Sequence, residues 1–149
     1  MYTTVLLIHS WLRWVALVAG VGATLTALFD RTDGARAERW GLALVTSLDL
    51  QMLIGLLLYF ALSPFTAVAM QDFGAAMKDP GLRFFAVEHV TMMLAAVVLV
   101  HAGRVLARKA TSPSSRRTRT FVCFGLATVL MVAAIPWPGL AHGRPLFRV

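Results

Sequence analysis

The chain has 149 residues, of which 58% are hydrophobic and only 14% are charged, and its mean hydropathy is +0.73. These values exclude an ordinary water-soluble domain and indicate an integral membrane protein. The net charge of +7 would suit nucleic acid, but the basic residues flank apolar segments instead of covering a soluble surface, which argues against that partner.

Four apolar segments approach or exceed the roughly 20 residues that cross a bilayer. They cover residues 5–29, 40–62, 84–106 and 118–135. We therefore predict an all-α membrane protein with a single domain, residues 1–149, formed by four transmembrane helices in an up-down bundle. The first segment lacks a basic start and is too long for a cleaved signal peptide, so we expect it to remain in the protein.

The Lys and Arg residues between these segments predict the orientation of the helices. Nine lie between the first and second segments or around the connection of the third to the fourth: Arg31, Arg36, Arg39, Arg104, Arg108, Lys109, Arg116, Arg117 and Arg119. Four lie on the other side: Lys78, Arg83, Arg144 and Arg148. Because cytoplasmic loops carry the excess of basic residues, we predict that the first and third loops are cytoplasmic and that both termini are periplasmic.

The first segment contains two ionisable side chains, His9 and Arg13, within VLLIHSWLRWVALVAG. A helical repeat places them on one face with small residues: Ala16, Gly20, Ala23 and Ala27. Small residues let helices approach closely in lipid, so we predict that this face points into the bundle. His9 then lies about one turn below the outer surface, and Arg13 lies about one turn deeper.

A buried arginine is expected to have an acidic partner, because a charge at that depth costs at least roughly 2.5 kcal/mol. The apolar segments offer Asp49 in the second and Glu88 in the third. Asp49 matches Arg13 in depth, whereas Glu88 lies near the outer end. Depth therefore favours an Arg13–Asp49 pair, with Glu88 as the alternative partner, and such a pair could serve only to hold helices together.

Between the second and third segments the sequence predicts a short helix in the outer membrane interface. Ser63 followed by Pro64 is a typical N-cap and first-turn pair. Apolar residues then recur at every fourth position: Phe65, Ala69, Phe73 and Met77. This spacing gives one apolar face, as interfacial helices have. We expect the helix to end near Asp79, which is also a candidate cap for the third transmembrane helix.

Two of the four histidines are predicted to lie at one depth on different helices. His89 is about five residues from the outer end of the third segment, as His9 is in the first. His101 lies close to the cytoplasmic boundary and is rotated by about 120° from His89, so the two cannot serve one ligand. His142 lies in the outer tail, near the region of His9 and His89.

Two imidazoles at equal depth on different helices are the axial ligands that a six-coordinate haem b requires. Three basic residues at the outer surface, Lys78, Arg83 and Arg144, could meet the haem propionates. A second interpretation stays open, in which both histidines are hydrogen-bonded members of the bundle core. The sequence has no P-loop, no GxGxxG motif and no Cys/His zinc spacing.

The chain resembles small bacterial inner-membrane proteins described as cytochrome b-like. The resemblance covers nearly the full length and lies in LIHSWLRW, LQMLIGLLLYFALSP, MKDPGLRFFAVEH, AAIPWP and GRPLFR. The positions that match the family pattern are His9, Arg13, Trp14, Gln51, Gly55, Tyr59, Pro64 and His89. Relatives commonly have a histidine where this chain has Asp49, which leaves His9 and His89 as the intramembrane pair.

The resemblance and the residues give two main hypotheses. The first is an electron-transfer protein or redox-complex subunit of the bacterial inner membrane, with one haem b held by His9 and His89 near the outer face. The alternative is a cofactor-free accessory subunit of a respiratory or photosynthetic complex, in which Arg13, Asp49 and Glu88 lock the bundle. Lipid and other membrane subunits are the expected partners. We expect neither a stand-alone enzyme nor a transporter, because no nucleophile–base pair, extramembrane domain or inverted repeat is recognisable.

Overall fold

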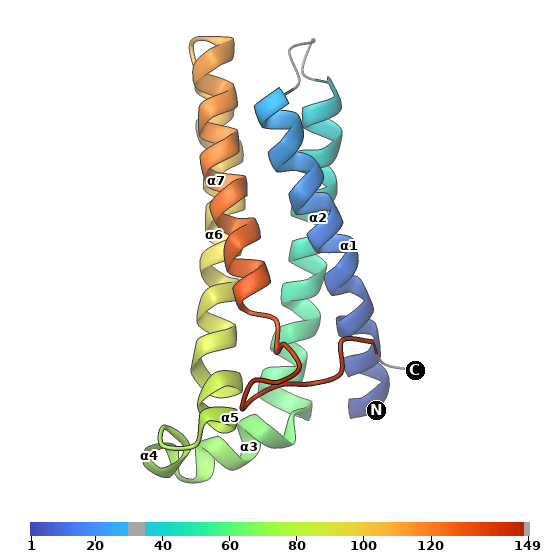
Figure 1. Cartoon of the computed structure of the whole chain (residues 1–149), viewed down its shortest axis with the longest axis vertical. Coiled ribbons are helices and arrows are strands. Elements are labelled where there is room, and N and C mark those ends of the chain that lie inside the picture. The colour runs from blue at the N-terminus through green and yellow to red at the C-terminus, as the bar shows by residue number, and fades with distance from the viewer. Residues whose placement is uncertain (30–34, 148–149) are drawn as a thin grey trace.

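The computed structural model describes residues 1–29 and 35–147, and these residues form helices without strands. Four long helices dominate: α1 (Tyr2–Phe29), α2 (Ala35–Leu57), α6 (His89–Arg108) and α7 (Pro113–Ala133). They lie side by side, with α1 against α2 and α7, and with α6 against α7 and α2 (Figure 1). Arg31 and Arg148, which contributed to the predicted orientation, lie outside the described residues.

Three helices of the described ranges are long and apolar enough to cross a membrane: Tyr2–Phe29, Ala35–Leu62 and Pro80–Arg108. They contain the first three predicted segments and extend beyond them into polar flanks. α7 contains most of the predicted fourth segment, but its first turns carry Arg116, Arg117 and Arg119, and it is not one of the three. The all-helical fold and its apolar helices are therefore confirmed.

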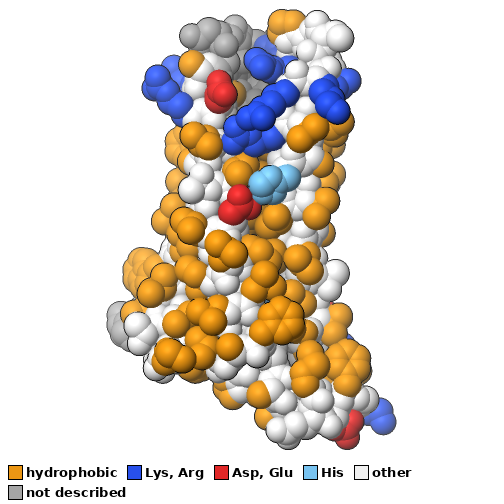
Figure 2. Space-filling view, turned by 180° about the vertical axis from the view of Figure 1, so that it is seen from behind, with side chains coloured by type: hydrophobic (Ala, Val, Ile, Leu, Met, Phe, Trp, Pro, Cys, Tyr) orange, Lys and Arg blue, Asp and Glu red, His pale blue; other side chains and the backbone are white. Residues whose placement is uncertain are grey.

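The predicted inward face of the first helix is also confirmed. Its four small residues, Ala16, Gly20, Ala23 and Ala27, are all buried. Ala16 and Ala23 belong to a core that includes Leu44 and Leu48 of α2, Val100 of α6 and Phe124 of α7. Apolar side chains cover most of the outer surface along the helices, and basic side chains gather at one end (Figure 2).

Three short helices follow α2 at the opposite end of the bundle (Figure 1): α3 (Pro64–Gln71), α4 (Phe73–Ala76) and α5 (Pro80–Arg83). The predicted cap is confirmed, because the Ser63 hydroxyl accepts a hydrogen bond from the Thr66 N–H at 3.5 Å. The prediction of one continuous helix up to Asp79 is wrong. The chain breaks at Asp72, whose carboxylate accepts from the Ala75 N–H at 2.9 Å and starts a new helix.

Two π-helical turns adjoin this end of the bundle: η1 (Leu58–Leu62) continues α2, and η2 (Phe84–Glu88) precedes α6. The Asp79 carboxylate caps the helical run that leads into α6, as predicted, by accepting from the Leu82 N–H at 2.8 Å. The Tyr59 hydroxyl of η1 donates to the Ala86 carbonyl of η2 at 2.8 Å. π turns are often found at functional sites, and this bond ties the two turns together.

Close contact between α6 and α7 yields a stability prediction at Gly103. A Cβ atom at this position would lie only 2.6 Å from the Cβ atom of Cys123, whereas one at Gly125 would meet its nearest neighbour, Thr24, at 3.6 Å. We expect Gly103→Ala to lower the free energy of unfolding in detergent by about 1–3 kcal/mol through overpacking. The matched variant Gly125→Ala should be neutral or slightly stabilising, because alanine favours helix.

Equal stability of the Gly103→Ala and Gly125→Ala proteins in a denaturant titration would contradict this close packing. The double variant Gly103→Ala with Cys123→Gly removes the opposing Cβ atom. It should therefore recover part of the loss if the contact with Cys123 is the cause.

Candidate functional site

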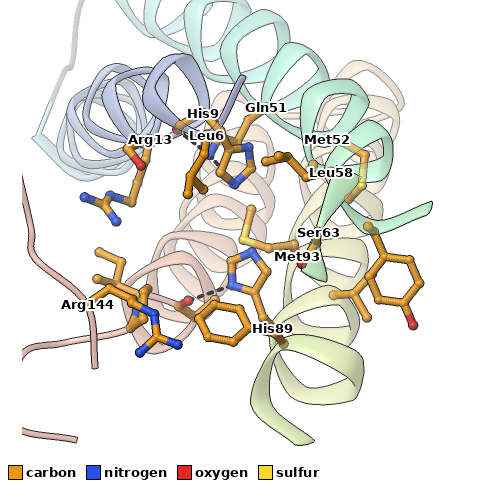
Figure 3. A pocket seen from close by; sticks show the side chains of 18 of the residues that line it. Leu6, His9, Arg13, Gln51, Met52, Leu58, Ser63, His89, Met93 and Arg144 are labelled. Carbon is orange, nitrogen blue, oxygen red and sulfur yellow. Dashed lines mark hydrogen bonds between the residues drawn. The ribbon is translucent and has the colours of Figure 1, made fainter. Parts of the chain in front are cut away.

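A pocket of about 140 Å³ lies at the end of the bundle that carries α3. Its walls come from α1, α2, η1, α3, η2, α6 and α7, and from the segment that follows α7. The lining is mostly apolar, with two histidines, His9 and His89, and two arginines, Arg13 and Arg144 (Figure 3). No Asp or Glu belongs to the described residues that line it. The pocket is therefore suited to a largely apolar ligand with negatively charged groups.

The structure brings His9 and His89 together, as the sequence predicted. Their ring centroids are 6.3 Å apart and their ring planes are inclined by 64°. His9 comes from the first third of α1, and His89 is the first residue of α6, directly after η2. The two imidazoles therefore face the same pocket from helices on opposite sides of it (Figure 3).

The imidazole of His89 is oriented by the end of α7. Its Nδ1 atom lies 2.8 Å from the carbonyl oxygen of Ala134, the residue that follows the last residue of α7. A carbonyl oxygen can only accept, so Nδ1 carries the hydrogen and Nε2 keeps its lone pair. Carbonyl groups at a helix C-terminus have no partner within the helix, so Ala134 is available for this bond. A metal-binding histidine is typically oriented by such a bond.

The imidazole of His9 is held by Gln51 of α2. The Gln51 amide nitrogen donates to the His9 carbonyl oxygen at 3.0 Å and lies 3.1 Å from His9 Nε2. With the amide fixed by the first bond, its second hydrogen points to Nε2, which then accepts. His9 Nδ1 is buried and has no hydrogen-bond partner within the described chain. Gly55 leaves room beside the ring, because a Cβ atom there would lie 3.2 Å from His9 Cε1.

Arg13 contacts the segment that follows α7, which crosses the end of the bundle (Figure 1). Its Nη2 group donates to the Leu146 carbonyl oxygen at 2.6 Å, and its guanidinium lies 4.9 Å from the ring centroid of Trp14. Phe147 stacks on Trp14 with 5.3 Å between the ring centroids. Arg13 therefore joins α1 to the C-terminal segment beside the pocket.

Of the three basic residues predicted to meet propionates, only Arg144 lines the pocket. Its guanidinium lies over the rings of Phe65 and Phe85, at 4.7 and 5.2 Å from their centroids. Arg83 is bound to Glu88 at 2.6 Å, and Lys78 lies beside α4 and α5.

The guanidinium groups of Arg13 and Arg144 lie on the same side of the two imidazoles (Figure 3). His142 lies at the same end of the bundle as His89, since its ring stacks on Phe84 with 3.7 Å between centroids and Phe84 in turn lies 5.8 Å from the His89 ring.

The predicted Arg13–Asp49 pair is not present, and neither is the alternative with Glu88. The Asp49 carboxylate binds His101 Nε2 at 2.8 Å, and Glu88 binds Arg83. Depth had favoured Arg13, but depth does not fix rotation. At 100° per residue, Asp49 lies about 160° around α2 from Gln51, the residue that faces α1. Asp49 therefore faces away from α1 and reaches α6.

Gln51 is the site residue whose role the sequence reasoning missed. It matched the family pattern, but no partner was assigned to it. Its polarity could have indicated this role, because Gln51 is the one amide side chain within the second apolar segment. In the structure it is only 4% exposed.

In the described part of the chain, no group of three or more His, Cys, Asp or Glu side chains could hold a metal ion by itself. Comparison of the chain with protein-family models, with curated proteins and with solved structures gave no match. The pocket and its two imidazoles are therefore the features from which a function can be inferred.

Proposed function

We propose that the chain is a four-helix membrane protein that carries one haem b between His9 and His89 and transfers electrons. The observation that carries the proposal is the pair of imidazoles facing one pocket, with centroids 6.3 Å apart. Metal–imidazole bonds of roughly 2 Å on both sides of one ion place the ring centres about 6 Å apart. The separation of the two histidines thus matches the requirement of one iron atom.

The remaining residues of the pocket support the same ligand. The lone pair of His89 Nε2 is available, since Nδ1 is bonded to Ala134. Arg13 and Arg144 lie on one side of the imidazoles, as the two propionates of one haem edge require (Figure 3). The rest of the lining is mostly apolar, as the macrocycle of a haem requires. When bound, haem b would supply one-electron transfer.

Binding requires two local changes in the chain. The lone pair of His9 Nε2 is engaged by Gln51, so the imidazole has to turn from Gln51 toward His89. The pocket of about 140 Å³ is smaller than the roughly 300–1,000 Å³ of ordinary cofactor sites, so side chains that line it beside the two imidazoles have to rearrange. Met52 and Met93 line it and are the flexible side chains best able to rearrange.

If both His9 and His89 held the haem iron, no position would remain open for a substrate. The chain's own residues then only bind, orient and shield the cofactor. This favours electron transfer over oxygen chemistry, because the axial ligands largely determine what a haem does. Electrons would be exchanged with other membrane subunits.

The same proposal places all four long helices across the bacterial inner membrane as an up-down bundle, with both termini periplasmic. Basic residues of α2, α6 and α7 gather at one end of the bundle, whereas both ends of the described chain lie at the other (Figures 1 and 2). The cytoplasmic side carries the excess of Lys and Arg. The pocket and the short helices α3 to α5 then lie at the periplasmic interface.

A cofactor-free accessory subunit remains the second candidate, and one observation favours it. Both histidines already have hydrogen-bond partners from the chain, Gln51 and Ala134, and the pocket between them is small. In that case the site is a polar contact that joins α1, α2, α6 and α7. The two candidates differ in whether the purified protein absorbs visible light.

The haem proposal predicts a visible absorption spectrum of a low-spin haem b in protein purified from its native membrane. His89→Ala and His9→Ala should each abolish or convert this spectrum, because each removes an axial ligand. His101→Ala is the matched control and should leave the spectrum unchanged, since His101 binds Asp49 and does not line the pocket. Protein without haem absorbance would sink the proposal and favour the accessory subunit.

The proposed topology predicts that a periplasmic reporter fused after residue 149 is active and that a cytoplasmic reporter at the same place is not. Fusions between α6 and α7, after Thr111, should give the opposite result, because that connection lies at the basic end. A cytoplasmic C-terminus would contradict the topology.

A further inference from the structure

A polar pair lies on the outer surface of the bundle, away from the pocket. Asp49 of α2 and His101 of α6 are joined by a 2.8 Å hydrogen bond, and their side chains are 41% and 51% exposed. Figure 2 shows a histidine and an acidic side chain in contact on this face, among apolar side chains and short of the basic end. His101 lies seven residues before the end of α6, which is about 10 Å along the helix axis.

The residues around the pair form an apolar frame. On α2, Leu42 and Leu53 lie on the same helix face as Asp49. On α6, Leu94 and Val105 lie on the same helix face as His101. All four are strongly exposed, at 54%, 65%, 47% and 49%. Val98, one turn before His101, is 65% exposed. We call these residues, together with Asp49 and His101, the Asp49–His101 face.

The polar pair is only partly satisfied. Its hydrogen bond joins Asp49 Oδ1 to His101 Nε2, and no bond to Asp49 Oδ2 or His101 Nδ1 is present within the described residues. Lipid tails offer no hydrogen-bond partner, so exposed polar atoms at this depth are costly. Polar side chains on the outside of transmembrane helices commonly bind another helix for this reason.

We propose that the Asp49–His101 face binds a second copy of this chain. An acid and a base in contact at one depth form a surface that is complementary to itself. A two-fold axis along the membrane normal keeps every residue at its depth and brings Asp49 of each copy to His101 of the other. Such isologous pairing is the commonest symmetry of homo-oligomers. In the dimer each imidazole carries a hydrogen on both nitrogens: Nε2–H donates to Asp49 Oδ1 of its own chain, and Nδ1–H donates to Asp49 Oδ2 of the other copy. These four hydrogen bonds form a closed ring, and the exposed leucine and valine side chains pack around it.

The test is energy transfer between donor-labelled and acceptor-labelled copies of the full chain in lipid vesicles, measured while lipid is added to dilute the protein. Asp49→Asn and His101→Gln should each weaken association by roughly 3- to 20-fold, the range of hydrogen bonds between membrane helices. A mixture of Asp49→Asn copies with His101→Gln copies restores one acid–imidazole contact across the interface. The mixture should therefore associate more strongly than either variant alone, although both have lost the contact within their own chain.

Steric variants provide the matched control, and they keep both polar residues. Val98→Trp blocks the Asp49–His101 face and should reduce association. Val129→Trp on α7 should not, although the Val129 side chain is 64% exposed and the Val98 side chain is 65% exposed. Energy transfer no greater than for randomly distributed monomers would overturn the proposal, and so would equal effects of the two tryptophan variants. Mixed variants that associate no better than each alone would show that the pair acts only within one chain. None of these measurements depends on haem.

Discussion

Apolar surroundings leave a polar side chain only the partners that the chain itself supplies, and this constraint shapes the bundle. The Gln51 amide donates both of its hydrogens to His9. The carbonyl oxygen of Ala134, the residue directly after α7, accepts a hydrogen bond from His89. Each bond joins two different helices. The polar groups therefore fix which helix faces meet, while the small residues of α1 let those faces approach.

The end of the bundle that holds the pocket is also where the helices depart from regular geometry. Two π turns, three short helices and the segment after α7 converge there, and the Tyr59 hydroxyl joins both π turns. Between the four long helices the core consists mainly of small and aliphatic residues, and Ala16, Leu17, Met131 and Ile135 of this core also line the pocket. The proposed cofactor would therefore be held where the helices are least regular, next to the core that joins them.

Much of the fold follows from the sequence because it depends on composition and helical repeat. The apolar helices, the small face of α1 and the caps at Ser63 and Asp79 are of this kind. The prediction of an Arg13–Asp49 pair was wrong because residues at the same depth can point in different directions around their helices.

Other features could not be predicted because tertiary contacts decide them. A π turn such as η2 changes the rotation of every residue after it, including His89, and has no recognisable sequence pattern. At Asp72 two local structures compete: the backbone can continue the helix, or the carboxylate can cap a new one. The sequence alone does not show which is more stable. The meeting of the two histidines could be predicted, but the partners that orient them, Gln51 and the Ala134 carbonyl, could not.

The most direct test of the central claim is electron paramagnetic resonance of the oxidised protein, purified in detergent from its native membrane. Ligation by both His9 and His89 predicts a low-spin ferric signal that is lost in His89→Ala; a high-spin signal in the unaltered protein, or no ferric signal at all, would contradict it.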